Sequence, residues 1–186
     1  MPDTKLDSLE LMWEVFDRLP EDMKAELVDG EIHVMSPSGG RPGRAATAIL
    51  ISLRAYERRA GGQAYGDNVG FRVDLPGRGS FSPDVSFHVG PEPTMKYVEG
   101  PPVFAVEVRS EGDYGPRMEA KLARKRDDYF AAGTQVVWDV DLLGADTVRA
   151  YRADRPDAPA VFRRGETADA EPAVPGWRFP VDDLFA

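Results

Sequence analysis

The stretch that decides the fold is Val103-Phe104-Ala105-Val106-Glu107-Val108, in which five of six residues are apolar. This run lacks the polar alternation of a half-exposed strand, so it predicts a strand buried on both faces of a sheet. A carboxylate in such a strand is costly unless it is paired, protonated or bound to a metal ion. Glu107 is therefore either a structural salt-bridge partner or part of a functional site.

A second acid, Asp84, opens the preceding predicted strand in Ser82-Pro83-Asp84-Val85-Ser86-Phe87. Aspartate is also common in turns and caps, so the dipeptide Pro83-Asp84 alone is weak evidence for a functional site. If strands 84–89 and 103–108 form an antiparallel hairpin closed by residues 91–102, Asp84 lies opposite or nearly opposite Glu107, with β-carbons about 5 Å apart. Two carboxylates at that separation repel each other unless a cation lies between them. Oxygen ligands of this kind suit Mg²⁺ or Mn²⁺ rather than zinc.

A lysine on the next helix is a candidate third member of the site. The helix is expected over residues 117–132. Residues placed at 100° intervals form one stripe that faces the core: Met118, Leu122, Tyr129 and Ala132. Lys125 falls inside this stripe and Lys121 at its edge. Most lysines extend their ammonium to water, whereas an inward ammonium beside two acids would be neutralised and could position the attacking water or the phosphate.

The rest of the chain alternates between strand and helix patterns. We expect a helix over 8–18, a hairpin over 25–35 around Asp29-Gly30, a loop over 36–43 and a helix over 44–59. Further strands are expected at 68–75, 135–140 and 147–151, and residues 175–185 are expected to pack back as a short strand and turn. Helices around a central sheet indicate a mixed α/β or α+β fold. We find no repeat or linker, which predicts one domain over residues 1–186.

Composition narrows the class of protein. The chain has 186 residues, 42% hydrophobic and 30% charged, as in a soluble globular domain. It contains no apolar run near the roughly 18 residues of a membrane span and no secretory signal pattern. The absence of cysteine excludes disulfides and thiolate metal sites, which suits a cytoplasmic location. The two histidines, His33 and His88, form no zinc-binding pattern.

The charge distribution is uneven. The net charge of −9 argues against a simple basic surface for nucleic acid, because phosphate binding depends mainly on Lys and Arg. Five arginines nevertheless lie between Arg41 and Arg59, and five basic residues lie between Arg117 and Arg126. Most of these are expected to be solvated helix faces.

The order Pro-Asp, strand Glu and helix Lys resembles the arrangement of PD-(D/E)xK nucleases, and the chain is similar to the Uma2 family of restriction-type endonucleases. The matching segments are residues 26–32, 34–37, 83–85, 97–102, 106–108, 174–177 and 184–185. Together they span almost the whole chain from about residue 25. Their common order and spacing are more specific than any single segment.

The resemblance implies a restriction-endonuclease-like mixed sheet flanked by helices, and a nuclease with Asp84 and Glu107 as metal ligands. The usual lysine position of the Glu-x-Lys motif is Arg109 here, so the lysine is expected on the following helix. Counting back from Tyr129 and Gly133 gives Lys125, which we prefer, whereas counting forward from Glu107 gives Lys121, which stays open.

Glu26 matches an acid of the family's N-terminal motif, where it either completes the metal site or caps the hairpin. The working hypothesis is phosphodiester hydrolysis in nucleic acid, with DNA as the expected substrate and Mg²⁺ or Mn²⁺ as the cofactor. The backbone carbonyl of Val108 would assist the two acids in holding the metal. The alternative is a catalytically inactive nuclease-like fold that serves as a DNA-binding or interaction module, and a homodimer is compatible with either.

Overall fold

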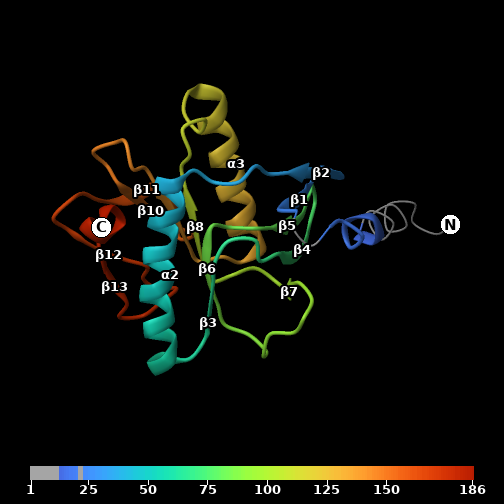
Figure 1. Cartoon of the computed structure of the whole chain (residues 1–186), viewed down its shortest axis with the longest axis horizontal. Coiled ribbons are helices and arrows are strands. Elements are labelled where there is room, and N and C mark those ends of the chain that lie inside the picture. Colours follow the sequence, from blue (N-terminus) through green and yellow to red (C-terminus); the bar gives the residue numbers. More distant parts are fainter. Residues whose placement is uncertain (1–12, 21–22) are drawn as a thin grey trace.

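The computed structural model describes residues 13–20 and 23–186 (Figure 1). Of the helix expected over 8–18, residues 8–12 lie outside the described residues, and 13–16 are helical. Two larger sheets and two long helices form the body of the molecule. The mixed α/β class expected from the sequence is confirmed.

The larger sheet has six strands and contains the apolar stretch 103–108. Its order is β11 (Arg155–Phe162), β10 (Val148–Arg152), β9 (Val136–Val140), β8 (Phe104–Val108), β6 (Val85–His88) and β3 (Gln63–Tyr65). The central strand β8 runs parallel to β9 and antiparallel to β6. Apolar residues lie on both faces of β8, as the largely apolar run predicts, and Glu107 is the exception.

The smaller sheet has five strands. Its order is β2 (Glu31–Val34), β1 (Ala25–Val28), β5 (Arg78–Phe81), β4 (Phe71–Leu75) and β7 (Val98–Glu99). The turn between β1 and β2 has φ of 49° at Asp29 and 77° at Gly30, as expected for a tight Asp-Gly hairpin. This sheet lies across from Glu107 and encloses the space that its side chain faces.

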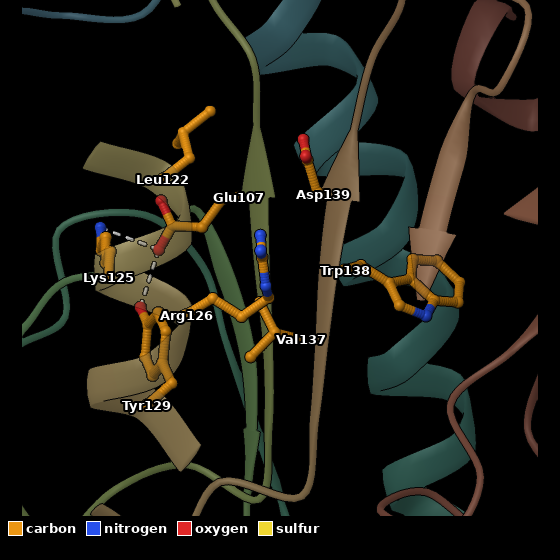
Figure 2. A pocket seen from close by; sticks show the side chains of 8 residues that line it. All are labelled: Glu107, Leu122, Lys125, Arg126, Tyr129, Val137, Trp138 and Asp139. Carbon is orange, nitrogen blue, oxygen red and sulfur yellow. Dashed lines mark hydrogen bonds and ion pairs between the residues drawn. The ribbon is translucent and has the colours of Figure 1, made fainter. Parts of the chain in front are cut away.

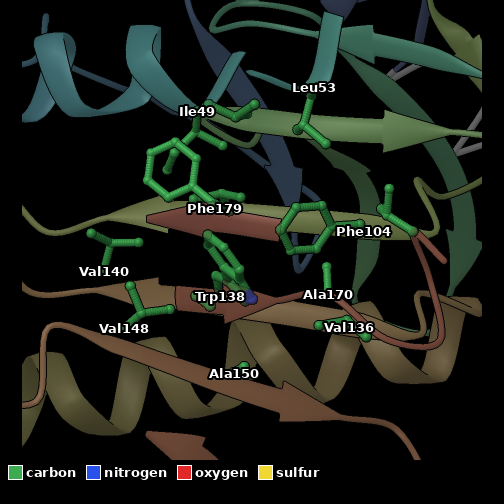
Figure 3. Packing of buried hydrophobic residues seen from close by; sticks show 14 of the residues in the cluster. Ile49, Leu53, Phe104, Val136, Trp138, Val140, Val148, Ala150, Ala170 and Phe179 are labelled. Carbon is green, nitrogen blue, oxygen red and sulfur yellow. The ribbon is translucent and has the colours of Figure 1, made fainter. Parts of the chain in front are cut away.

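The two helices cover opposite faces of the six-stranded sheet. Helix α2 (Gly40–Ala60) buries Ile49 and Leu53 against the face formed by Phe104 and its even-numbered neighbours on β8. Figure 3 shows these side chains on one side of the strands and the α3 helix (Pro116–Ala132) on the other. On the α3 side, the Tyr129 ring stacks 4.0 Å from Phe81 of the five-stranded sheet. Glu107 therefore faces a space enclosed by α3 and the smaller sheet.

The C-terminal segment packs back onto the core of the six-stranded sheet as a short strand and a turn, as expected. β12 (Thr167–Asp169) pairs with β13 (Arg178–Pro180), and a 3-10 helix, η1 (Val181–Phe185), follows. Trp177 and Phe179 pack against Trp138 of β9 and bury one end of the core.

Other expectations need correction. The expected strand at 68–75 is present as β4, but β5, which follows it in a hairpin, was not expected, and the expected connection over 91–102 contains β7. Helix α2 begins at Gly40 rather than 44, because a proline in the first turn lacks only a donor that would be unpaired there. Strand β11 was not expected; its two prolines are tolerated because it lies at the sheet edge. Within the described residues, neither long helix has the apolar length that a membrane crossing requires.

Candidate active site

Glu107 meets two side chains of α3 (Figure 2). Its Oε1 accepts a hydrogen bond from the Tyr129 hydroxyl at 2.7 Å and lies 2.9 Å from Lys125 Nζ. Lys125 and Tyr129 are four residues apart and therefore share one face of the helix. Of the two lysines considered from the sequence, Lys125 is the one at Glu107, whereas Lys121 is exposed.

Burial and charge pairing shift the pKa values of both Glu107 and Lys125. Burial raises the pKa of Glu107 to about 6; Lys125 counteracts this, while Asp84 and Glu26 add to it. Burial alone would lower the pKa of Lys125, but Glu107 and Glu26 outweigh it and raise that pKa. At neutral pH, Lys125 is therefore charged and Glu107 is mostly ionised.

Glu26 of β1 holds Lys125 from the opposite sheet. Its Oε1 lies 2.9 Å from Lys125 Nζ and accepts the backbone N–H of Ser82 at 2.9 Å, while Oε2 accepts from Arg78 at 2.9 Å. Arg78 in turn donates to Asp128 of α3. Burial would raise the pKa of Glu26, but its cationic partners and hydrogen bonds lower it. The contacts of Glu26 are thus those of a residue that fixes Lys125.

Asp84 lies just before β6, against Glu107. Its backbone N–H donates to the Val106 carbonyl, and its Oδ2 accepts the Val108 N–H at 2.8 Å. These are the two chain neighbours of Glu107, so the proximity of the two acids expected from the hairpin pairing is present. The other oxygen, Oδ1, lies 3.1 Å from Lys24 Nζ.

Arg109 occupies the usual lysine position of the motif, but its side chain pairs with acids other than Asp84 and Glu107. It donates two hydrogen bonds of 2.6 Å to Asp139, which lies beside Glu107 on β9. It also pairs with Glu119 of α3. The Arg109 side chain is only 5% exposed, so this fork ties β8, β9 and α3 together.

A cleft of about 220 Å³ opens beside Asp84. The first turns of α2 line the cleft at Pro42, Gly43 and Thr47, and Asp67 lines it as well. On the α3 side, a cavity of about 10 Å³ adjoins Glu107 and Lys125, enough for about one water molecule.

Sequence reasoning missed four charged residues around these acids: Lys24, Asp67, Arg78 and Asp128. They lie on different segments of the chain and meet only in the folded protein. A lysine before a short strand or an arginine between two glycines has no special spacing, so no local pattern marked them.

The donor set fits a hard divalent cation. Asp84 and Glu107 offer carboxylate oxygens, and Mg²⁺ is usually held by one or two carboxylates with water completing its shell. Within the described part of the chain, no group of three or more His, Cys, Asp or Glu side chains is arranged to hold a metal. A metal here would therefore need backbone oxygen and water as further ligands.

Comparisons with known proteins bear on the fold and the family of this chain. A crystal structure described as "a putative nuclease belonging to DUF820" from Anabaena variabilis ATCC 29413 is similar, with a TM-score of 0.72 and 19% identity. The match covers 92% of this chain and 96% of that one. No curated protein matches. The model of the Uma2 family, described as "Putative restriction endonuclease", matches residues 13–182, and the chain therefore belongs to the Uma2 family.

Proposed function

We propose that this protein is an endonuclease that hydrolyses phosphodiester bonds in DNA with the help of Mg²⁺ or Mn²⁺. The observation that carries the proposal is the meeting of Asp84 with Glu107 on neighbouring strands, with the Lys125 ammonium against Glu107. Membership of the Uma2 family supports nuclease chemistry. The oxygen-rich donor set supports a divalent metal ion.

Asp84, Glu107 and the backbone carbonyl of Val108 would hold the ion. The Val108 N–H is directed at Asp84. The N–H and C=O of a strand residue point to the same side of the strand, so the Val108 carbonyl faces that side as well. When bound, the metal would neutralise charge on the phosphate and lower the pKa of a coordinated water.

The side chains around the two acids have distinct tasks in this proposal. The Lys125 ammonium stabilises the attacking water or a phosphate oxygen, and it stays charged because Glu26 and Glu107 flank it. Tyr129 fixes one oxygen of Glu107 and leaves the other, Oε2, for the metal. The cleft beside Asp84 admits the substrate backbone. Arg41, which is exposed in the first turn of α2, contacts phosphates there, and this contact sets affinity without reading sequence.

The test is a cleavage assay on plasmid, linear and single-stranded DNA and on RNA, with Mg²⁺, Mn²⁺ or EDTA. We expect cleavage of DNA only with metal, and a loss of at least about 100-fold in Asp84→Asn, Glu107→Gln and Lys125→Met. Asp29→Asn is the matched control, because Asp29 is an exposed acid paired with Arg124 outside the site. Equal cleavage by the wild type and Glu107→Gln would rule the mechanism out.

A catalytically silent DNA-binding module is the second candidate. The net charge of −9 and the arginine at the usual lysine position favour it. This candidate predicts DNA binding that is unaffected by Asp84→Asn, with no cleavage of any substrate under any metal condition. Light scattering on the same samples tests the homodimer that belongs to either candidate, since a twofold mass identifies it.

A further inference from the structure

A second lysine, Lys24, contacts Asp84. Lys24 directly precedes β1, and its Nζ lies 2.5 Å from Asp67 Oδ1 and 3.1 Å from Asp84 Oδ1. The Lys24 side chain is 16% exposed, whereas that of Asp67 is 47% exposed. The ammonium therefore bridges a shielded acid of the site and an acid on the wall of the cleft.

The contacts of Asp84 leave little freedom for a metal ion. Its Oδ2 already accepts the Val108 N–H, and Oδ1 accepts from Lys24. A Mg²⁺ ion binds carboxylate oxygen at about 2.1 Å. A metal bound at Oδ1 would share that oxygen with the ammonium, and two cations this close repel each other strongly where water is partly excluded.

We propose that Lys24 is the internal counter-ion of Asp84 in the metal-free protein and moves from Asp84 to Asp67 when a divalent ion binds. This inference rests on the proposed function, because it presumes that Asp84 is a metal ligand. Lys24 thus competes with the metal for one oxygen, and Asp67 is the partner that retains the displaced ammonium. Both act as positioning residues that set the metal affinity of the site.

The geometry favours Asp67 as the receiving partner. Lys24 Nζ is closer to Asp67 than to Asp84, so the ammonium keeps its shorter ion pair while it leaves the longer one. The Lys24 backbone is fixed by a hydrogen bond from the Met35 N–H to its carbonyl. Only the side chain needs to move.

The test is titration of the full-length protein with Mn²⁺ alone, without nucleic acid, by calorimetry. We expect Lys24→Gln to bind Mn²⁺ about tenfold more tightly than the wild type, because the competing charge is gone. Asp67→Asn is expected to bind Mn²⁺ more weakly, because Asp84 is then the only anionic partner of the Lys24 ammonium, which competes with the metal ion for it. Lys24→Arg keeps the charge and is expected to stay close to the wild type, which separates loss of charge from misfolding.

The double variant Lys24→Gln/Asp67→Asn distinguishes an effect of Asp67 that acts through Lys24 from a direct electrostatic effect of Asp67 on the metal ion. If Asp67 acts through Lys24, the double variant binds Mn²⁺ as tightly as Lys24→Gln. A through-space effect of Asp67 would instead persist without Lys24, and that result would overturn the proposal. The matched charge changes Arg124→Gln and Asp29→Asn, in an exposed ion pair, are expected to leave Mn²⁺ binding unchanged.

The two proposals fail differently. If the wild type binds Mn²⁺ and Asp84→Asn does not, but Lys24→Gln shows no gain, the metal site stands and the role of Lys24 is wrong. If Mn²⁺ does not bind the wild type or Lys24→Gln, the metal site itself is wrong and this inference falls with it.

Discussion

Ionisation of Glu107 costs the folded protein stability. Burial leaves its carboxylate with less solvation than in the unfolded chain, and the nearby acids Asp84 and Glu26 add repulsion. Lys125 and Tyr129 offset part of this cost by contacting one oxygen. A divalent cation at the free oxygen would remove the remaining cost, which is the arrangement expected of a ligand.

This residue predicts a pH dependence of stability. The pKa of Glu107 is raised from 4.5 to about 6, so the folded protein holds this proton more tightly than the unfolded chain. The stabilising contribution is complete below pH 4.5 and is lost as the pH rises through about 6. We expect the stability of the wild type relative to Glu107→Gln to fall by about 2 kcal/mol across this window without divalent metal.

Urea denaturation of the two proteins from pH 4 to pH 8 measures this difference. Asp29→Asn serves as the control, because Asp29 is exposed and lies outside the site. A stability difference between the wild type and Glu107→Gln that is constant with pH would show that Glu107 titrates normally.

At the scale of elements, the site joins α3 to both sheets through charged side chains. Arg109 is the clearest case, because its guanidinium fork contacts Asp139 of β9 and Glu119 of α3 while almost fully buried. The fork geometry matches two carboxylates in a way that a lysine ammonium does not. The presence of Arg109 instead of the lysine of the usual Glu-x-Lys motif thus has a structural explanation.

We expect Arg109→Met to lower the free energy of unfolding by about 3 kcal/mol, because it leaves the shielded Asp139 without its cation. Arg124→Met is the matched control: Arg124 also joins α3 to another segment, but its ion pair is exposed and is expected to contribute far less. Thermal or urea denaturation measures both. Equal effects would mean that the Arg109 fork is no more than a surface ion pair.

The same elements explain which parts could be predicted from sequence. Asp84, Glu107 and Lys125 stand out because each breaks a local pattern: an acid at or within an apolar strand, or a lysine on a core-facing helix stripe. Lys24 and Arg78 break no such pattern. Their partners Asp84 and Asp128 lie 60 and 50 residues away. Only the packing of the five-stranded sheet against the six-stranded sheet and against α3 brings these pairs together.

Strand predictions failed for a related reason. The eight residues of β11 include two prolines and an exposed half, so neither alternation nor an apolar run marks them. Pairing with β10 stabilises this strand in spite of its local sequence. Strand β5 was likewise hidden by its flanking glycines Gly77 and Gly79, although Gly79 packs its backbone against Leu27.

At the scale of the whole molecule, the proposed binding of DNA requires a local surface that outweighs the acidic net charge. The net charge of −9 repels nucleic acid at long range. The N-terminal end of α2 lines the cleft beside Asp84, and Arg41 is exposed in that first turn. Arg59 is equally exposed, but it lies 18 residues further along the helix, about 27 Å away.

This arrangement predicts that position, rather than total charge, decides binding. Measured by fluorescence anisotropy in an Asp84→Asn background that prevents cleavage, Arg41→Glu is expected to weaken DNA binding about tenfold and to lower the salt slope by about one phosphate contact. Arg59→Glu makes the same change in net charge and is expected to leave the DNA affinity and the salt slope nearly unchanged. If the two variants weaken binding equally, DNA responds to the overall charge of the molecule, and the cleft beside Asp84 is not where its backbone lies.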